Sequence, residues 1–342
     1  MARSAAVITI SKRFLLAVMI LTVTALVLTL VGITHAGSPS RILRAGTLQF
    51  QAHPIAKTFD YFADRVFKLT NGDLKISVHY ARSLGDAREV VEYIRLGTVD
   101  FAHVPTANLT QILPVFDVFS LPFIFKNTGH YWAFLHSEKA QKLLEPLNAK
   151  GITPLFWVET GVRSFFTRGK PIRHPDDMKG MKIRVMASPI MVGTINALGG
   201  NGVALAASEL YGALQTGVVD GAEMAPNMYY SYRYYEVTDF FAESEHFMTP
   251  DVMLMSKKTW DSLSKGQKEA ILKASAEAES YLRGADSAFL EFAVSEIKKM
   301  NKFVTVDKAP FQKAVAAFVA EQAKKLGAED IVADIQKIGE QY

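Results

Sequence analysis

Two arginine residues occupy strand positions from which a charged side chain could meet a ligand. Arg163 follows the strand-like segment 152–158, so it lies just past the carboxyl end of a strand, where ligands of open α/β sheets bind. Arg184 lies in segment 182–185, where branched apolar and basic residues alternate as on a half-buried strand. The alternation predicts that Arg184 shares a face with Lys182. A plain surface position remains the alternative for Arg163.

Motifs for catalysis are absent from the sequence. It contains no Gly-x-Ser-x-Gly elbow, His-Glu-x-x-His helix, Walker loop or Gly-x-Gly-x-x-Gly fingerprint, and it has no cysteine. The adjacent carboxylates Asp176 and Asp177 are better explained as helix capping than as a metal or acid–base pair. Gln49 and Glu223 could reach a cleft and leave a metal-bridged ligand open, but no metal-ligand spacing supports one. We therefore predict no enzyme, no cofactor and no resident metal.

A strand–helix pattern that occurs twice predicts two similar α/β lobes. In the first copy, segment 73–78 reads as a strand, and a capping box at Asp86 opens a helix that ends at Gly97. In the second copy, segment 182–185 is followed by a helix for which Ser208 is a plausible N-cap and which Gly217 would end in the left-handed conformation.

Each copy then continues with Gly-x-Val-Asp. Segments 98–100 and 218–220 are expected to start the next strand of each lobe. Since binding sites favour domain interfaces and strand ends, we expect the ligand site in the cleft between the lobes.

Composition indicates a globular chain with a large core. The sequence has 342 residues, of which 49% are hydrophobic, and its net charge is +4. This length predicts two domains. The chain has no dense Lys/Arg block or RNA-binding aromatic signature, which argues against a nucleic-acid partner.

Residues 1–36 have the pattern of a signal peptide. A positive region with Arg3, Lys12 and Arg13 precedes an almost uncharged apolar run over 14–33, and Thr34-His35-Ala36 is a small-x-small cleavage site. The run is about as long as the ~20 residues that span a bilayer, so an uncleaved anchor is the alternative. We expect an exported protein that acts in the periplasm.

Further elements follow from periodicity and caps. Segment 43–50 reads as the first strand, and His53-Pro54 opens a helix that extends to Leu69. His53 lies at the mouth of that helix and could face the cleft. The remaining predicted elements are a helix over 131–147, a strand over 250–255 that returns the chain to the first lobe, a long helix from Ser264 to about Asn301, and closing helices over 311–326 and 331–338.

Taken together, several ordered motifs resemble those of one known family, the solute-binding proteins of TRAP (tripartite ATP-independent periplasmic) transporters of the C4-dicarboxylate-binding type. The resemblance covers essentially the whole chain after residue 36. The motifs are Ser83-Leu84-Gly85-Asp86-x-Arg88-Glu89, Leu96-Gly97-Thr98-Val99-Asp100, Phe119-Ser120-Leu121-Pro122-Phe123, Gly161-x-Arg163, Met178-Lys179-Gly180-Met181-Lys182-Ile183-Arg184-Val185, Ser208-Glu209-Leu210-Tyr211-x-Ala213-Leu214-Gln215-Thr216-Gly217 and Asp220-Gly221-Ala222-Glu223.

The resemblance implies a two-lobed α/β fold of the type II periplasmic binding protein class, with an inter-lobe ligand cleft and a long connecting helix. It implies a protein that captures a small organic acid and delivers it to the membrane subunits of a TRAP transporter. A periplasmic subunit that senses the ligand for a membrane receptor is the alternative. The expected division is a signal peptide over 1–36, lobe 1 over 41–160 plus about 251–290, and lobe 2 with the closing helices over 161–250 plus about 291–342.

By the same resemblance, Arg184 is the arginine that clamps the ligand carboxylate and Arg163 is the second basic residue of the site. A guanidinium offers paired donors that match a carboxylate. The chain departs from sialic-acid-binding members at Met224, Ala187 and Ala207, which replace polar or aromatic residues. These three residues predict a ligand with an apolar or aromatic body. Other candidates for the pocket wall are Asn227, Trp157, Tyr229 and Phe165.

Overall fold

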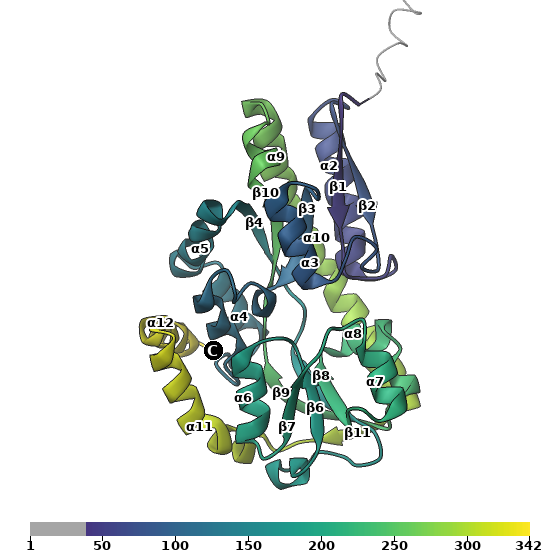
Figure 1. The fold of residues 1–342 in the computed structure, drawn as a ribbon, viewed down its shortest axis with the longest axis vertical. Helices are drawn as coiled ribbons and strands as arrows, with labels where there is room; N and C mark the ends of the chain where they lie inside the picture. The colour runs from purple at the N-terminus through teal and green to yellow at the C-terminus, as the bar shows by residue number, and fades with distance from the viewer. Residues whose placement is uncertain (1–38) are drawn as a thin grey trace, which may run out of the picture.

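The computed structural model describes residues 39–342, which form two lobes, each built on one β-sheet (Figure 1). The predicted signal peptide lies outside the described residues. Within 39–342, no helix has the length and apolar character needed to cross a membrane.

The sheet of lobe 1 has five strands, in the order β2-β1-β3-β10-β4. Four of the strands are parallel, and β10 runs antiparallel between β3 and β4. Because β10 comes from late in the chain, it returns to lobe 1 as the sequence predicted. The strands are β1 (Arg41–Gly46), β2 (Leu74–His79), β3 (Phe101–Pro105), β4 (Ile152–Val158) and β10 (Asp251–Ser256).

The sheet of lobe 2 has six strands, in the order β11-β9-β5-β8-β6-β7. Strand β5 runs antiparallel to both of its neighbours, whereas β6 is parallel to β7 and β8. The strands are β5 (Arg163–Thr167), β6 (Lys182–Val185), β7 (Asn201–Ala204), β8 (Gly221–Met224), β9 (Phe240–Phe247) and β11 (Lys302–Thr305).

Helices cover the sheets, and local sequence explains many of their ends. The capping box of Asp86 is present at the start of α3, and Gly97 ends that helix with φ 76°. The helices are α2 (Pro54–Leu69), α3 (Ala87–Leu96), α4 (Thr128–Leu135), α5 (Glu138–Leu144), α6 (Pro189–Ala197), α7 (Leu210–Thr216), α8 (Pro226–Ser231), α9 (Lys257–Asp261), α10 (Lys265–Met300), α11 (Lys308–Lys325) and α12 (Glu329–Gly339).

The repeated Gly-x-Val-Asp motif performs the same task in both lobes. Asp100 accepts a hydrogen bond from the backbone N–H of Arg44 at 2.7 Å, and Asp220 accepts one from that of Lys182 at 2.7 Å. Each aspartate therefore fixes the loop before a strand to the neighbouring strand. The prediction that these segments start the strands was wrong by three residues, because β3 and β8 begin directly after the aspartates.

The predicted cap of α7 is also corrected. The helix begins at Leu210 with Glu209 as the N-cap residue, and Gly217 ends it with φ 74° as expected. Ser208 does not cap it. Instead, the Ser208 hydroxyl donates to the Asp86 carboxylate of lobe 1 at 2.8 Å.

The chain passes between the lobes at two adjacent connections and along one helix. The connection from β4 to β5 and that from β9 to β10 are joined where the Thr160 hydroxyl donates to the carbonyl of Thr249 at 2.9 Å. Helix α10 packs on α2 of lobe 1 and on α8 of lobe 2. Figure 1 shows this helix running from the upper lobe toward the lower one. Two short connections and a continuous helix make a stiff hinge.

The closing helices contact both lobes. Helix α11 packs on α6 of lobe 2, and α12 packs on α4 of lobe 1, along one side of the molecule in Figure 1. Ile331 and Ile335 of α12 are buried in a core cluster that also contains Phe134 and Leu135 of α4. The C-terminal segment therefore stabilises the pair of lobes as a unit.

Candidate functional site between the lobes

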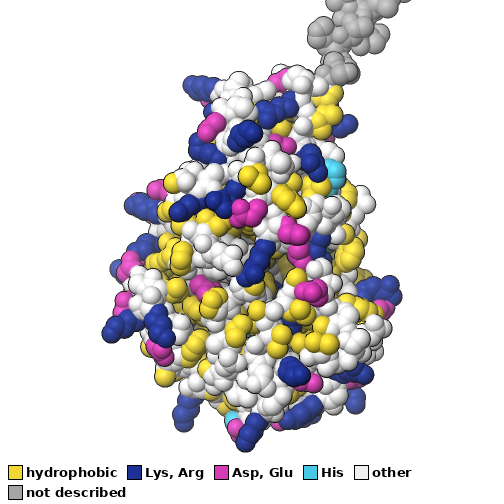
Figure 2. All heavy atoms as spheres, in the orientation of Figure 1, with side chains coloured by type: hydrophobic (Ala, Val, Ile, Leu, Met, Phe, Trp, Pro, Cys, Tyr) yellow, Lys and Arg dark blue, Asp and Glu magenta, His cyan; other side chains and the backbone are white. Residues whose placement is uncertain are grey.

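A cavity of about 1070 Å³ lies between the lobes and receives side chains from both sheets. On the lobe 1 side its wall includes Gln49, Arg82 and Asp251, and on the lobe 2 side it includes Arg163 and Arg184. Figure 2 shows basic and acidic side chains together along the junction of the lobes, beside a hollow in the surface. The cavity is where a ligand would contact both lobes at once.

Arg184 contributes a buried charge that lacks an acidic partner. It lies on β6 between β7 and β8, and only 2% of its surface is exposed. Its Nε donates to the carbonyl of Leu205 at 2.8 Å, whereas no partner is found for Nη1 among the described residues. Burial lowers the pKa of Arg184, although Tyr234 and Glu223 partly oppose this effect. A buried donor without a partner at a cavity wall is suited to an anionic ligand.

Arg163 is already paired within the protein. Its Nε donates to Glu223 Oε2 at 2.5 Å, and its Nη2 donates to Glu223 Oε1 at 2.9 Å and to the Glu223 carbonyl at 3.0 Å. Both side chains are buried on neighbouring strands, β5 and β8. This bidentate pair neutralises Arg163 and fixes its plane. Of Arg163 and Arg184, Arg184 is therefore the stronger candidate for the carboxylate.

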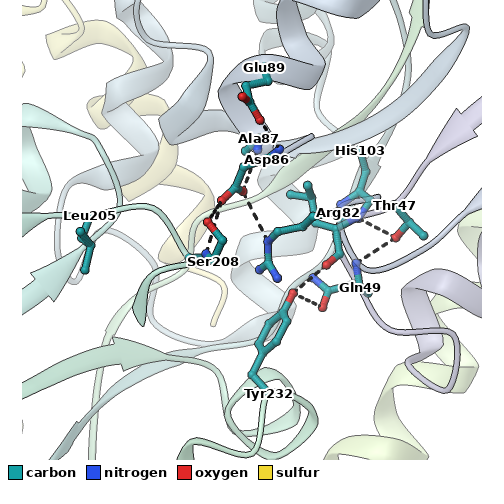
Figure 3. A network of polar contacts seen from close by, with 12 residues as sticks. Thr47, Gln49, Arg82, Asp86, Ala87, Glu89, His103, Leu205, Ser208 and Tyr232 are labelled. Atoms are coloured by element: carbon teal, nitrogen blue, oxygen red, sulfur yellow. Dashed lines mark hydrogen bonds and ion pairs between the residues drawn. The ribbon is translucent and has the colours of Figure 1, made fainter. Parts of the chain in front are cut away.

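Sequence reasoning missed Arg82 and Tyr232, and it considered Gln49 only for a metal-bridged ligand. The three side chains form one network (Figure 3). The Arg82 guanidinium lies 4.6 Å from the centroid of the Tyr232 ring, and the Tyr232 hydroxyl donates to Gln49 Oε1 at 2.7 Å. Arg82 and the preceding Ala81 both have positive φ, 62° and 53°. Such conformations in residues other than glycine are uncommon and often mark functional sites.

Two hydroxyl–carboxylate hydrogen bonds connect the lobes at the edge of the cavity. Besides Ser208 and Asp86, the Ser188 hydroxyl donates to Asp117 Oδ1 at 2.5 Å. Figure 3 shows the Asp86 carboxylate between Ser208 and Arg82. Because these bonds need the lobes to be in contact, they indicate a closed arrangement. The sequence signal for them was weak, since a serine near a helix start usually caps its own helix.

Three of the predicted apolar or small residues lie on the cavity wall. Met224, Ala187 and Ala207 all line it, together with Met186 and Met228. They form part of the lobe 2 side. Polar residues of lobe 1 complete the wall, so the cavity is not uniformly apolar.

The structure places four other predicted residues outside the cavity lining. Trp157 is fully buried against Phe119, and Phe165 stacks on His246 with ring centroids 3.9 Å apart. The Tyr229 hydroxyl bonds to the Thr238 hydroxyl at 2.7 Å. The rings of Trp157 and Phe165 face the sheet cores because alternate residues of a strand point to opposite faces, and Tyr229, on α8, packs on Phe166 and Phe241. The fourth, Asn227, donates to Asp286 on α10 at 2.9 Å.

His53 is a structural cap. Its Nδ1 accepts a hydrogen bond from the backbone N–H of Ile55 at the start of α2, and the side chain is 1% exposed. Burial, and then the proximity of His103, lower the pKa of His53 to about 3. His53 therefore serves the start of α2 and is not part of the cavity lining.

Metal binding finds no support within residues 39–342. No group of three or more His, Cys, Asp or Glu side chains there could hold a metal ion. Glu223, which left a metal-bridged ligand open, is fully buried and bonded to Arg163. The cavity can hold an anion through its arginines and polar groups through Gln49 and Asp251.

Comparison with known proteins defines the class. The profile of the family described as "Bacterial extracellular solute-binding protein, family 7" matches residues 46–326. The chain belongs to this family of solute-binding receptors, whose TRAP periplasmic members have the two-lobed type II periplasmic binding protein fold predicted from the sequence.

Individual relatives agree over most of the chain. A solute-binding protein of Chromohalobacter salexigens is 31% identical over 293 residues, which cover 83% of this chain and 86% of that protein. A TRAP solute-binding protein of Sulfitobacter sp. with bound β-D-galacturonate has a TM-score of 0.82 and 31% identity, over 88% of this chain and 100% of that one. One of Sulfurospirillum deleyianum with bound succinate has a TM-score of 0.84 and 30% identity, over 88% and 99%.

Proposed function

We propose that this protein captures a small organic acid in the cavity between its lobes and delivers it to the membrane subunits of a TRAP transporter. The observation that carries the proposal is the buried Arg184 guanidinium at the cavity wall, for whose Nη1 residues 39–342 supply no hydrogen-bond partner. A ligand carboxylate would supply the missing acceptor.

The physical reason is the cost of a buried charge. A guanidinium removed from water is unfavourable unless an opposite charge accepts its hydrogen bonds. Burial lowers the pKa of Arg184, which reflects this cost. A carboxylate between the lobes would relieve the cost and favour closure, since the lobe 2 arginine and the lobe 1 wall would then share one ligand.

The solved relatives support a carboxylate as the shared feature of the ligands. β-D-Galacturonate and succinate differ in size and in hydroxyl groups, but both carry a carboxylate. We infer that this chain binds its ligand without converting it, and that it acts outside the cytoplasm after export by the predicted signal peptide.

A thermal-shift screen over carboxylic acids tests the proposal. A ligand at a hundred times its Kd stabilises the native state by about 2.7 kcal/mol, which raises the melting temperature by several degrees. The screen should include galacturonate, glucuronate, galactonate and succinate, and recovery of the unchanged acid after incubation tests the absence of turnover. If no acid in the screen shifts the melting temperature, the proposed function is wrong.

A further inference from the structure

We propose that Asp251 selects the ligand: it accepts hydrogen bonds from the hydroxyl groups of a polyhydroxylated monocarboxylate and disfavours a ligand with a second carboxylate at that end. The inference rests on the proposed function and assigns a specificity role to a residue of the lobe 1 wall.

The other acidic residues of the site named here have partners within the protein. Asp117 accepts from the Ser188 hydroxyl, and Glu223 forms the bidentate pair with Arg163. Asp86, at the start of α3, accepts from Ser208 and from the N–H of Ala87. Asp251, which is 3% exposed, is bonded through Oδ2 alone, to His103 Nδ1 at 2.9 Å. Its other oxygen has no recorded partner in residues 39–342.

The hydrogen bonds of His103 show that Asp251 Oδ2 is the acceptor in their pair. The backbone N–H of Leu48 can only donate, and it lies 3.3 Å from His103 Nε2, so Nε2 is an acceptor. The Thr47 hydroxyl, which already accepts from the N–H of Gln49, donates to the same nitrogen at 3.1 Å. Figure 3 shows the bond between Thr47 and His103. The imidazole is therefore the neutral tautomer with its proton on Nδ1, which is donated to Asp251.

The position of Asp251 places its carboxyl group across the cavity from the lobe that carries Arg184. Asp251 is the first residue of β10, paired with Pro105 and Val158 at the carboxyl ends of β3 and β4 in lobe 1. Arg184 is on β6 of lobe 2, and both residues line the cavity. An acid that gives its carboxylate to Arg184 would therefore extend its other end toward the lobe 1 wall.

Gln49, which lies on the same wall, indicates that the ligand groups near Asp251 are hydroxyls. Its Oε1 is used by Tyr232, which leaves its amide N–H groups as donors at the cavity wall. A hydroxyl can donate to Asp251 and accept from Gln49, whereas an ammonium could only donate. Arg82 is less available to a second carboxylate, because its guanidinium lies over Tyr232 and its Nε forms an ion pair with Asp86 of the same lobe at 3.4 Å.

The ligand class inferred from Asp251 differs from the apolar or aromatic ligand expected from Met224, Ala187 and Ala207. These residues line one side of the cavity, but a buried carboxylate on the other side requires hydrogen-bond donors from the ligand. Sites built to bond hydroxyls reject ligands that lack them, and like charges in a desolvated cavity repel. The favoured ligand is thus a sugar acid with one carboxylate.

Calorimetry with a matched pair of acids tests this inference. Galactonate and galactarate share their chain of hydroxyls and differ only at one end, where galactarate has a second carboxylate in place of a CH2OH group. We expect the protein to bind galactonate at least tenfold more tightly. Asp251→Asn should weaken galactonate binding by about tenfold to a hundredfold, the range for a hydrogen bond to a charged group, and should reduce the preference to threefold or less.

Asp117→Asn is the control, because Asp117 is also a buried carboxylate of the lobe 1 wall but has its own partner in Ser188. It should change the affinities for both acids by the same factor. If galactarate binds the parent protein as tightly as galactonate, or if Asp251→Asn keeps the preference, the inference is wrong while the proposed function stands. If neither these acids nor the others of the screen bind, both are wrong. The comparison of the two acids on the parent protein decides the inference even if the Asp251 variant fails to fold.

Discussion

Replacement of Arg184 should remove most of the ligand affinity with little effect on the ligand-free fold. In the bound state the Arg184 guanidinium and the ligand carboxylate would form a desolvated pair, and removal of one partner from such a pair costs about 3–5 kcal/mol. At 1.4 kcal/mol per tenfold change, Arg184→Ala should weaken binding by roughly a hundredfold to a few thousandfold.

The ligand-free protein should respond differently. Arg184 makes one recorded hydrogen bond, to the carbonyl of Leu205, and burial disfavours its charge. Loss of that bond costs about 1 kcal/mol, and loss of the desolvated charge offsets it. The free energy of unfolding should therefore change by no more than about 1 kcal/mol. Arg184→Lys should recover part of the affinity at most, because an ammonium cannot reproduce the planar fork of donors.

Isothermal titration calorimetry with galactonate and galacturonate, together with urea denaturation of the ligand-free variants, measures both effects. Arg168→Ala is the matched control, since this arginine follows β5 and bonds to the carbonyls of Leu214 and Gln215 away from the cavity lining. It should leave the affinity unchanged. An Arg184→Ala protein that binds within threefold of the parent, or that loses several kcal/mol of stability, would show that Arg184 braces lobe 2 and does not hold the ligand.

Three further predictions concern stability. Three features carry them, and the first is Asp286, because burial raises its pKa to about 7 and the folded state therefore holds a proton that the unfolded state releases. The free energy of unfolding should fall as pH rises from about 4 to 7, by on the order of 4 kcal/mol. Urea denaturation of Asp286→Asn should show that this pH-dependent loss is removed. Burial lowers the pKa of His53 to about 3, so the unfolded state binds the proton more readily and stability should fall as pH drops from about 6.5 to 3; His53→Asn, which retains a capping oxygen, should be less sensitive to acid by the same measurement. Gly161 has φ 81° and an added Cβ would lie 3.0 Å from the Cβ of Ala225, whereas Gly169 has φ 73° and open space around it. Gly169→Ala should therefore lower the free energy of unfolding by about 1 kcal/mol, and Gly161→Ala should lower it by about 1 kcal/mol more. Equal losses of melting temperature in the two variants would contradict the close contact at the hinge.

Local sequence was sufficient for features that depend on neighbouring residues. The capping box at Asp86 and the left-handed end at Gly97 each involve residues a few positions apart, and the structure has both. The half-buried alternation expected around Arg184 was wrong, because Ile183, Arg184 and Val185 are all buried. The repeated motif that contains Asp100 and Asp220 was recognised from its sequence. In the structure both copies make the same hydrogen bond to a neighbouring strand. These local rules also predicted two sheets.

Side chains that meet across the two lobes could not be assigned from local patterns. Asp251 faces the cavity because β10 returns from lobe 2 and inserts between two strands of lobe 1, and its partner His103 is 148 positions away. The position of the Arg82 side chain depends on a left-handed backbone conformation, which the sequence does not indicate because the residue is not a glycine. Trp157 and Phe165 were misplaced for the opposite reason, since apolar residues at strand ends fit either face until the pairing is known.

A crystal structure of the protein with galactonate tests the central claim most directly. The account predicts that the acid lies between the lobes, with its carboxylate within hydrogen-bonding distance of Arg184 Nη1 and a hydroxyl on the free oxygen of Asp251. A structure in which the bound acid directs its carboxylate away from Arg184, or in which it occupies a surface outside the cavity between the lobes, would contradict the account.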